Sequence, residues 1–419
     1  MSNHTFHDGR QSGSRQMIYF VALIMLMVSS CQPAVVPTVT NIPATPTPRA
    51  SIETQPVSGG PVLLRTGISL LSIAKVDAGS IKLVRHPKTG DLYILNPSSG
   101  LHRLKMDQSH QVEKVASPAD IVEDATLSGM EFGPDGTLFV VANRTVKKIY
   151  NQAIIRKGTA NQDGTFTWKT LAETEPYPLS GTQFDHLFNG IVVSPDGKTV
   201  YVNSGSRTDH GEVEDNSSNF PDTRDVALTA KIFQIPADAE DLILPYDEEA
   251  LKAEGRIFAW GTRNSYDPAF APNGDLFAGD NGPDADFPDE LNWLRQGKHY
   301  GFPWRFGDQD NPQQFPDYTG VGDKHLSTDF MAVQTGRYRN DPTFPKAPGE
   351  FTPPVANLGP DADQYRADDG SQLDASSEGK PLYTFTPHRS PLGLVFSTSS
   401  KMPADFRGNE TTFSAFLLS

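Results

Sequence analysis

The amino-acid sequence predicts an all-β fold of repeated antiparallel hairpins, and three observations carry that prediction. Glycine (35) and proline (34) are abundant among the 419 residues, helix signals are sparse, and a strand–turn–strand unit recurs four times. Short strands that recur in hairpins every few tens of residues are typical of a β-propeller or another repeat architecture. A sandwich of separate hairpins is the weaker alternative, because similar units recur along one chain.

Residues 1–31 have the features of a bacterial lipoprotein signal peptide. Arg10 and Arg15 form a basic start, and Met17 to Val28 is an apolar run of only 12 residues. Such a run is short for a membrane span and suits the central part of an export signal. Cys31 is the only cysteine, so we expect its thiol to be lipidated and to become the mature N-terminus. A plain secretory signal with an incidental cysteine is the alternative.

A Pro/Thr/Ser-rich tether is predicted for residues 32–61, and a folded propeller domain for residues 62–419. One cysteine excludes an intrachain disulfide. The formal net charge of -15 argues against nucleic acid or an anionic membrane surface as a partner. We therefore expect an exported protein on the outer face of the bacterial cytoplasmic membrane or cell envelope, with membrane contact only through the N-terminal lipid.

The four hairpin units have a common pattern of an apolar strand, a turn rich in Pro, Asp or Asn and Gly, and a second strand. They are Leu83 to Ile94, Gly129 to Val140, Gly190 to Val202 and Asp267 to Ala278. Proline presets φ in such a turn, and glycine tolerates positive φ after it. The intervals between their starts grow along the chain, which predicts loops inserted on one face, where repeat folds carry function.

Other segments complete the expected fold. Outer strands are predicted at Arg144 to Tyr150 and Ala230 to Pro236, and one or two helical turns at Asp247 to Glu254. Phe306 to Lys380 is polar and barely periodic, so we expect an insertion that is functional or wrapped over the surface. Ser390 to Phe396 has the pattern of the opening strand of another blade.

The first candidate for chemistry is the pair Asp185-His186, which precedes the strand that starts at Gly190. A histidine can accept a proton near neutral pH, and an adjacent carboxylate can orient it. A histidine that only caps a loop is the alternative. Gly205 to Glu212 is dense in polar side chains and either lines the same opening or forms a solvated turn.

The second candidate is the pair Arg263-Asn264. Arginine offers a planar fork of donors for a carboxylate, and asparagine adds an amide beside it. A surface ion pair with one of the many carboxylates is the alternative.

The third candidate is the acidic turn from Asp280 to Glu290, followed by Tyr300. Calcium binds six to eight oxygens from carboxylates and backbone carbonyls, and the bend Asn281-Gly282-Pro283 would expose carbonyls. The spacing is not that of an EF-hand, and a solvated acidic turn is the alternative. The sequence contains no HExxH, G-x-S-x-G, Walker or G-x-G-x-x-G motif, so zinc hydrolysis, serine acyl transfer and nicotinamide chemistry lose support.

These residues together resemble the glucose/sorbosone dehydrogenase family, the soluble quinoprotein sugar dehydrogenases. The resemblance extends from about Gly67 to the C-terminus. It is carried by Asp185-His186 before a strand that ends in a Pro-Asp-Gly turn, by Arg263-Asn264, and by the run from Asn281 to Trp304 with its elements NGP, DELN and GKHYGFPW.

The resemblance implies a six-bladed β-propeller of four-stranded antiparallel blades that uses pyrroloquinoline quinone (PQQ) and calcium to oxidise a sugar or aldehyde. His186, beside Asp185, would take the hydroxyl proton while hydride passes to the quinone. Arg263, Asn264 and Asn281 would hold the cofactor. The predicted metal-ligating set comprises the carbonyls of Gly282 and Pro283 for the calcium at the quinone, Glu290 and Tyr300 for a second, structural calcium, and Asp289.

The sequence ends where members of that family continue for about another blade. Five blade openings are visible, so we expect the last blade to be incomplete and the chain to be truncated relative to the family. The electron acceptor is unidentified. Two alternatives stay open: a non-catalytic, calcium-stabilised propeller lipoprotein that binds carbohydrate or a protein, and a calcium-dependent lactonase.

Overall fold

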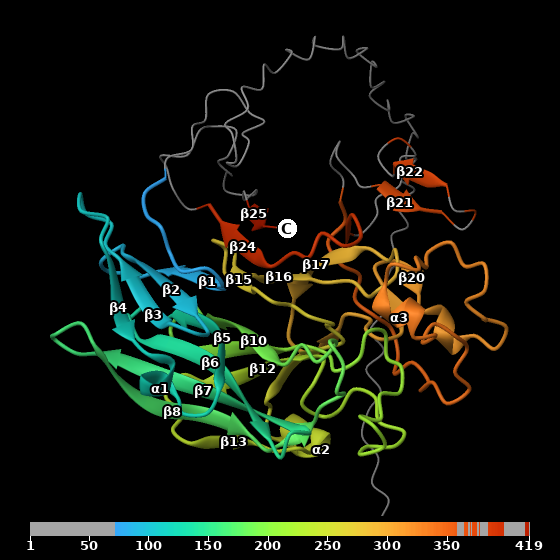
Figure 1. Cartoon of the computed structure of the whole chain (residues 1–419), viewed down its shortest axis with the longest axis horizontal. Coiled ribbons are helices and arrows are strands. Elements are labelled where there is room, and N and C mark those ends of the chain that lie inside the picture. Colours follow the sequence, from blue (N-terminus) through green and yellow to red (C-terminus); the bar gives the residue numbers. More distant parts are fainter. Residues whose placement is uncertain are drawn as a thin grey trace, which may run out of the picture. The chain divides into compact units, whose positions relative to one another are not determined.

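Four sheets of four to six strands form most of the fold (Figure 1). The computed structural model describes residues 72–357, 364–367, 369, 371–374, 377, 384–397 and 415–418. The predicted signal peptide, Cys31 and the tether lie outside these residues. Within them, no helix has the length and apolar character needed to cross a membrane.

The sheets are built mainly from strands that follow one another in the chain. The first sheet has the order β1 (Lys82–Arg85), β2 (Leu92–Asn96), β3 (Gly100–Leu104), β4 (Val112–Ala116). The second has the order β13 (Leu242–Leu244), β8 (Phe166–Thr174), β7 (Tyr150–Ala160), β6 (Leu138–Val146), β5 (Thr126–Phe132), with β9 (Tyr177–Pro178) paired to β7. The third has the order β10 (Phe188–Val193), β11 (Thr199–Ser204), β12 (Lys231–Pro236), β14 (Ile257–Trp260), β18 (Lys298–His299). The fourth has the order β15 (Ala269–Phe270), β16 (Leu276–Asp280), β17 (Asp289–Leu294), β23 (Thr384–Phe385).

Neighbouring strands in these sheets are antiparallel, except that β13 pairs in parallel with β8 and β18 with β14. Three two-stranded sheets complete the strands: β19 (Arg305–Phe306) with β20 (Gln309–Asp310), β21 (Gln364–Arg366) with β22 (Gln372–Asp374), and β24 (Gly393–Phe396) with β25 (Ala415–Leu418).

In the part of the chain that the structure describes, helices are few and short: α1 (Pro118–Ile121), α2 (Glu248–Ala253), α3 (Met331–Gln334) and a single 3₁₀ turn, η1 (Pro312–Gln314). The side chain of Asp247 caps α2 by accepting a hydrogen bond from the Ala250 N–H, 3.0 Å away. The predicted short helix at this place is therefore confirmed.

Each of the four predicted hairpins is present, as β1–β2, β5–β6, β10–β11 and β15–β16. The turn glycines Gly90, Gly136, Gly197 and Gly274 all have φ between 74° and 92°. This is the left-handed region that glycine enters without a steric cost, so the turn residues set the hairpins locally.

The hydrophobic core lies between consecutive sheets. One buried cluster joins the first and second sheets and includes Tyr93, Leu95 and Met130. Another joins the second and third sheets around Ile155, Phe188 and Phe233, and a third joins the third and fourth sheets. Sheets that pack face to face in chain order are the arrangement expected for propeller blades.

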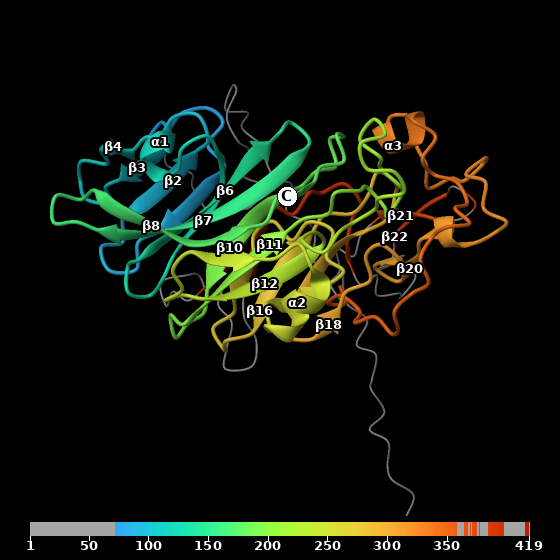
Figure 2. The same ribbon diagram turned by 90° about the horizontal axis from the view of Figure 1, so that it is seen from below.

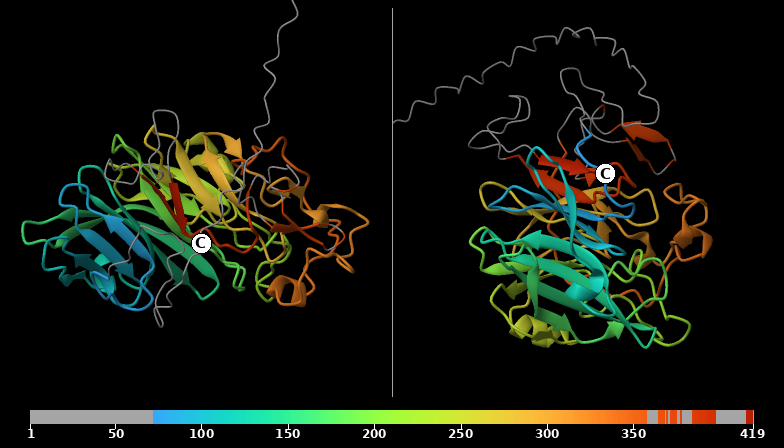
Figure 3. Two further views of the ribbon diagram at one scale, coloured as in Figure 1. Left: turned by 90° about the horizontal axis from the view of Figure 1, so that it is seen from above. Right: turned by 60° about the vertical axis from the view of Figure 1, so that its left-hand side comes forward.

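The prediction of six blades is wrong for the described residues, which form four blade-sized sheets. The fifth predicted opening strand exists as β24, but within the described residues it pairs only with β25. It lies beside β15 and β16 (Figure 3). The described parts of the insertion at 306–380 form only short pairs of strands and single turns, because that stretch lacks the alternating apolar pattern that a blade needs.

The insertion nevertheless shares a small hydrophobic core with loops that precede it in the chain. Phe287, Phe302, Phe306, Ala332 and Tyr338 are buried together, so the segment that carries α3 packs against loops of the third and fourth sheets. Figure 2 shows this orange segment beside the yellow-green loops that follow β11.

The opening strands of neighbouring sheets approach each other closely. An ideal Cβ on Gly129 of β5 would lie 1.9 Å from the carbonyl oxygen of Asn189, and one on Gly190 of β10 would lie 2.4 Å from that of Tyr266. Real Cβ atoms do not come this close to backbone oxygens. Both positions therefore require glycine because of packing, not because of φ.

We expect Gly129→Ala to lower the free energy of unfolding by about 1–3 kcal/mol or more, since the added methyl group must push two strands apart. The urea midpoint of purified protein measures this. Gly349→Ala is the matched control, because nothing lies within 4 Å of a Cβ at Gly349. Equal midpoints for the two variants would show that β5 and β10 can separate at little cost.

An ion pair links the first sheet to the fourth. The ammonium of Lys82 on β1 contacts the carboxylate of Asp267, just before β15. The other oxygen of Asp267 accepts a hydrogen bond from the N–H of Leu394 on β24, 3.3 Å away. Burial raises the pKa of the nearby Glu131 to about 7, although the charge of Lys82 opposes this increase.

The raised pKa of Glu131 predicts a pH-dependent contribution to stability. Its contribution is fully present below the unfolded-state pKa of roughly 4.3 and is lost as the pH rises through about 7. The free energy of unfolding of the wild type should therefore fall between pH 5 and pH 8 by about 2–3 kcal/mol more than that of Glu131→Gln. Urea titrations of both proteins at the two pH values measure the difference. Parallel pH dependence would contradict the raised pKa.

Candidate active site

The predicted site residues lie on loops at one edge of the third sheet. β10 begins and β11 ends at this edge, and β12 begins and β14 ends there, because neighbouring strands are antiparallel. The loop before β10 carries His186, the loop after β11 carries residues 205–214, and the segment after β14 carries Arg263 and Asn264. The fold thus brings together the residues that the sequence analysis had singled out separately.

The imidazole of His186 is held in one tautomer by Ser206. Its Nδ1 lies 3.1 Å from the Ser206 carbonyl oxygen and 3.2 Å from Ser206 Oγ. Ser206 Oγ donates its own proton to the Thr208 carbonyl, so it can only accept from His186. Nδ1 therefore carries the proton, and Nε2 presents a lone pair.

His186 is neutral at physiological pH. Burial, with the positive charge of Arg263 adding to it, lowers the pKa of His186 to about 3. Gly205 allows the loop after β11 to approach, since a Cβ there would lie 2.4 Å from the Cβ of His186. A neutral imidazole with a free lone pair at Nε2 can accept a proton from a ligand.

Asp185 is placed differently from its neighbour. Its carboxylate accepts hydrogen bonds from the backbone N–H groups of Ser180 and Gly181 at 2.8–3.1 Å, and burial raises its pKa. Within the described residues these contacts hold the loop that leads to His186. The group that orients the imidazole itself is Ser206, which the sequence analysis did not identify.

A chain of buried amides fixes the orientation of Asn264. Asn189 Nδ2 donates to Asn264 Oδ1 at 2.8 Å, and Asn203 Nδ2 donates to Asn189 Oδ1 at 2.7 Å. With its oxygen occupied in this way, Asn264 directs its NH₂ group away from the amide chain. That group is a donor available to a ligand.

Arg263 forms a buried ion pair. Its Nε donates to the Asp209 carbonyl oxygen and its Nη2 to Asp209 Oδ1, each at 2.7 Å, and its Nη1 lies 3.3 Å from the Asn281 carbonyl oxygen. Arg263 thus forms the ion pair of the alternative interpretation, but the pair is buried and not at the surface. The partner is a carboxylate with no solvent exposure, and the arginine side chain is 7% exposed.

Asp209 accepts four kinds of donor. Besides Arg263, these are His210 Nδ1 at 2.9 Å, the Tyr338 hydroxyl at 3.0 Å and the Asp284 N–H at 2.9 Å. Burial alone would raise the pKa of Asp209, but the charge of Arg263 and the hydrogen bond from His210 hold it well below its ordinary value. Tyr338 also stacks on His210, with ring centroids 3.8 Å apart, so the insertion covers this ion pair.

Two buried carboxylates, Asp280 and Glu290, line the same small cavity as Arg263. Asp280 accepts hydrogen bonds from the backbone N–H groups of Arg263 and Asn264. It stands directly opposite Glu290 in the antiparallel register of β16 and β17. Burial raises the pKa of Asp280 to about 6, with the negative charge of Asp289 adding to the rise. Burial likewise raises the pKa of Glu290 to about 8, with the negative charge of Asp280 adding to it. The pair would release protons more readily beside a cation.

The bend from Asn281 to Pro283 lies at the same place. A cavity of about 10 Å³, the size of a single water or ion, is lined by Asp280, Asn281, Gly282 and Glu290 among others. Asn281 Oδ1 is buried and has no hydrogen-bond partner within the described residues. A Cβ on Gly282 would meet the carbonyl oxygens of Phe287 and Pro288 at 3.1 Å and Asp289 Oδ1 at 3.2 Å. The donor set is thus rich in oxygen.

The five predicted metal ligands do not all converge. Gly282 and Asp289 meet through the Gly282 N–H, which donates to Asp289 Oδ1 at 2.7 Å. The hydroxyl of Tyr300 instead contacts the backbone of Trp293 and Arg295, at the far end of β17 from Glu290. Across residues 72–357 and the later described segments, no group of three or more His, Cys, Asp or Glu side chains is arranged to hold a metal.

Three residues of the site lie outside every candidate segment of the sequence: Asn189, Asn203 and Tyr338. Ser206 and Asp209 lie in the candidate run Gly205 to Glu212, but the sequence assigns them no individual role. The density of polar residues in Gly205 to Glu212 was the available signal for Ser206 and Asp209. Asn189 and Asn203 stand in strand patterns, where a buried amide is not distinguishable from a solvent-facing one. Tyr338 lies in the insertion, which carries no periodic signal.

A family model and a curated relative indicate the same family. The family described as Glucose / Sorbosone dehydrogenase matches residues 88–321, which is more than half of the chain. The chain is 26% identical over 263 residues to quinoprotein glucose dehydrogenase B of Acinetobacter calcoaceticus, covering 57% of this chain and 51% of that protein. It therefore spans about half the length of the curated relative that it matches.

Among solved structures, the PQQ-bound aldose sugar dehydrogenase of Streptomyces coelicolor aligns with a TM-score of 0.40 and 19% identity, covering 57% of this chain and 66% of that one. The holo PQQ domain of pyranose dehydrogenase from Coprinopsis cinerea aligns with a TM-score of 0.44 and 15% identity, covering 77% of this chain and 69% of that one. At this level of similarity they imply nothing further about this chain.

Proposed function

Because the chain belongs to the glucose/sorbosone dehydrogenase family, we propose that it oxidises a sugar or aldehyde with PQQ as the cofactor. The observation that carries the proposal is the state of His186. Its imidazole is neutral, its tautomer is fixed by Ser206, and it shares one edge of the third sheet with Arg263 and Asn264.

The polar groups of the site would offer partners to the cofactor and to a cation beside it. Asn264 offers its NH₂ group, and Asn281 Oδ1, which has no partner among the described residues, offers an acceptor in the same site. Arg263 would contribute its positive charge, although Asp209 already engages two of its nitrogen atoms. The bend at Gly282 and Pro283, with Asp289 and Glu290 nearby, would supply oxygens to calcium.

The chemistry divides between the cofactor and the chain. PQQ, when bound, supplies an acceptor for the two electrons that leave the substrate carbon as hydride. His186 takes the hydroxyl proton of the substrate at Nε2, while Ser206 holds Nδ1–H and so keeps the lone pair in place. Asn189 and Asn203 keep the amide of Asn264 oriented. A separate electron acceptor would then reoxidise the cofactor.

Titration of the purified protein with PQQ and calcium tests the proposal, followed by dye reduction with a panel of aldoses and aldehydes. We expect saturable binding and sugar-dependent dye reduction. Folded protein that neither binds PQQ nor reduces dye would contradict the proposal, and would favour the non-catalytic binding protein considered from the sequence.

We further propose that the protein is exported and anchored through lipid on Cys31. The short apolar run and the following tether support this. Metabolic labelling with a radioactive fatty acid is expected to mark the wild type and not Cys31→Ser. Labelling of both proteins would contradict the anchor.

A further inference from the structure

A second cavity, of about 490 Å³, lies at the outer strands of the third sheet. It is lined from β12, β14, β18 and α2 by Lys231, Trp260, His299, Glu248 and Lys252, among others. His186 precedes β10, at the inner end of the same sheet, and does not line this cavity. The proposed oxidation therefore uses none of these five side chains.

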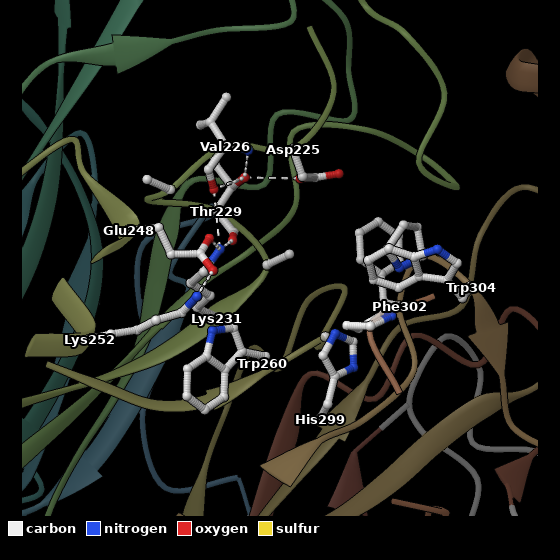
Figure 4. A pocket seen from close by; sticks show the side chains of 15 residues that line it. Asp225, Val226, Thr229, Lys231, Glu248, Lys252, Trp260, His299, Phe302 and Trp304 are labelled. Carbon is white, nitrogen blue, oxygen red and sulfur yellow. Dashed lines mark hydrogen bonds and ion pairs between the residues drawn. The ribbon is translucent and has the colours of Figure 1, made fainter. Parts of the chain in front are cut away.

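One wall of the cavity carries a fixed set of charges. Glu248 contacts the ammonium of Lys231 at 3.2 Å and that of Lys252 at 2.9 Å. Lys231 also donates to the carbonyl oxygens of Val226 and Thr229, at 3.3 and 3.1 Å. Figure 4 shows these groups together on the same side as Trp260.

The charges lining the cavity balance. Lys231 and Lys252 oppose Asp225 and Glu248, and they are the ionisable lining groups apart from His299. Burial, with the charge of Lys231 adding to it, lowers the pKa of His299 to about 4, so the imidazole is neutral. A cavity with no net charge favours a neutral ligand over an anion or a cation.

The opposite wall is aromatic. Figure 4 shows His299, Phe302 and Trp304 across the cavity from Trp260. Trp304 is held by its Nε1–H, which donates to the Pro345 carbonyl at 2.7 Å, and by stacking on Phe351 with ring centroids 6.0 Å apart. Rigid aromatic faces bind apolar surfaces at a small cost in conformational entropy.

His299 also offers a directed donor. Its Nδ1 accepts the N–H of Gly301 at 3.1 Å, so the proton of the neutral ring lies on Nε2. Trp260, which also lines the cavity, carries an indole N–H as a second donor. The cavity therefore combines donors, carboxylate acceptors and apolar faces.

We propose that this cavity binds the ring of a neutral sugar at a site separate from His186. A pyranose ring has apolar C–H faces, which suit Trp260 and Trp304. Its hydroxyl groups donate and accept, which suits the ammonium and carboxylate groups of the charged wall. A flat aromatic ligand would cover the same faces but would offer the ion-paired groups of the charged wall no hydroxyl group to bind, while displacing the water that solvates them. The volume lies within the range of small-ligand sites, about 300–1,000 Å³.

Isothermal titration calorimetry of the full chain with methyl β-D-glucopyranoside, methyl β-D-galactopyranoside and methyl β-D-xylopyranoside tests the proposal. These glycosides have no free anomeric hydroxyl, so they report binding without oxidation at that carbon. We expect saturable binding of at least one glycoside, weakened tenfold or more in Trp260→Ala. Trp293→Ala is the matched control, because Trp293 is 38% exposed and does not line the cavity.

Glu248→Gln provides a second variant that leaves the aromatic walls intact. It gives the cavity a net positive charge, so we expect several-fold weaker glycoside binding and a gain of binding to D-gluconate, an anionic open-chain relative. Binding that is equal in wild type, Trp260→Ala and Glu248→Gln, or absent in the wild type, would overturn the proposal.

Two further titrations test where the glycoside binds and whether its hydroxyl groups matter. Loss of glycoside binding in His186→Ala, with Trp260→Ala unaffected, would place the ligand at the candidate active site and overturn the proposal. Benzyl alcohol that binds as tightly as the glycosides would show a generic apolar cavity and would overturn the assignment to sugars. None of these titrations requires turnover. Glycoside binding to this cavity can therefore be present or absent whether or not the protein is a dehydrogenase.

Discussion

His186→Ala is expected to lower kcat for sugar oxidation by about 10²–10⁴-fold, the contribution typical of a positioned general base. The variant removes the imidazole and with it the Nε2 lone pair. In the wild type, the hydrogen bond from Nδ1–H to Ser206 keeps this lone pair on Nε2. Arg263 and Asn264 remain in place, because their hydrogen-bond partners are Asp209, Asp280 and the amide of Asn189. Steady-state dye reduction with PQQ and calcium at saturation measures the loss.

Binding of PQQ by His186→Ala should remain within a few-fold of wild type. Ser206→Ala is the matched control, since it retains the backbone carbonyl that accepts from Nδ1 and removes only Oγ. Its kcat should fall far less than that of His186→Ala. A His186→Ala protein that binds PQQ and turns over at the wild-type rate would exclude His186 as the base.

Asp209→Asn is expected to lower the free energy of unfolding by about 3–5 kcal/mol, the cost typical of breaking a buried ion pair. The substitution leaves Arg263 buried without its counter-charge. The substitution also replaces one carboxylate oxygen with an NH₂ group, which then faces hydrogen-bond donors. These donors are His210 and Tyr338 if Oδ2 is replaced, or Arg263 and Asp284 if Oδ1 is replaced. Urea unfolding of both proteins measures the difference.

Asp308→Asn is the matched control for this experiment, because Asp308 is exposed. Its effect should stay within about 0.5 kcal/mol, as for most surface substitutions. Since Arg263 loses its anchor in Asp209→Asn, weaker binding of PQQ should accompany the loss of stability. A small effect for Asp209→Asn would mean that water or another group can replace the carboxylate at little cost.

The hairpins were predictable from the sequence because their signals are local. A glycine at Gly136 or Gly197 must sit where φ is positive, and the apolar strands on either side then pair at once. The short helix that Asp247 caps was predictable for the same reason. The grouping of His186, Arg263 and Asn264 in one site came from the resemblance to the family, because these residues lie too far apart in the chain for a local pattern to join them.

What the sequence did not predict depends on contacts between distant residues. Asp209 and Arg263 are 54 positions apart, and Tyr338 reaches Asp209 across 129 positions. No local pattern distinguishes the buried Asp209 from the many exposed aspartates. The number of blades was also wrong for the described residues, because it was inferred from a family and not from periodicity within residues 306–380.

The contact of Lys82 with Asp267 has a consequence for the order of folding. The two residues are separated by 185 positions, so the first strand gains this partner only after three sheets lie between them in the chain. Closing so long a loop costs entropy before the contact repays it, and folds dominated by non-local pairings form slowly. We expect the first sheet to dock on the fourth late, in a phase that Lys82→Met slows or removes while the earlier phases remain. Stopped-flow refolding from urea would resolve the phases.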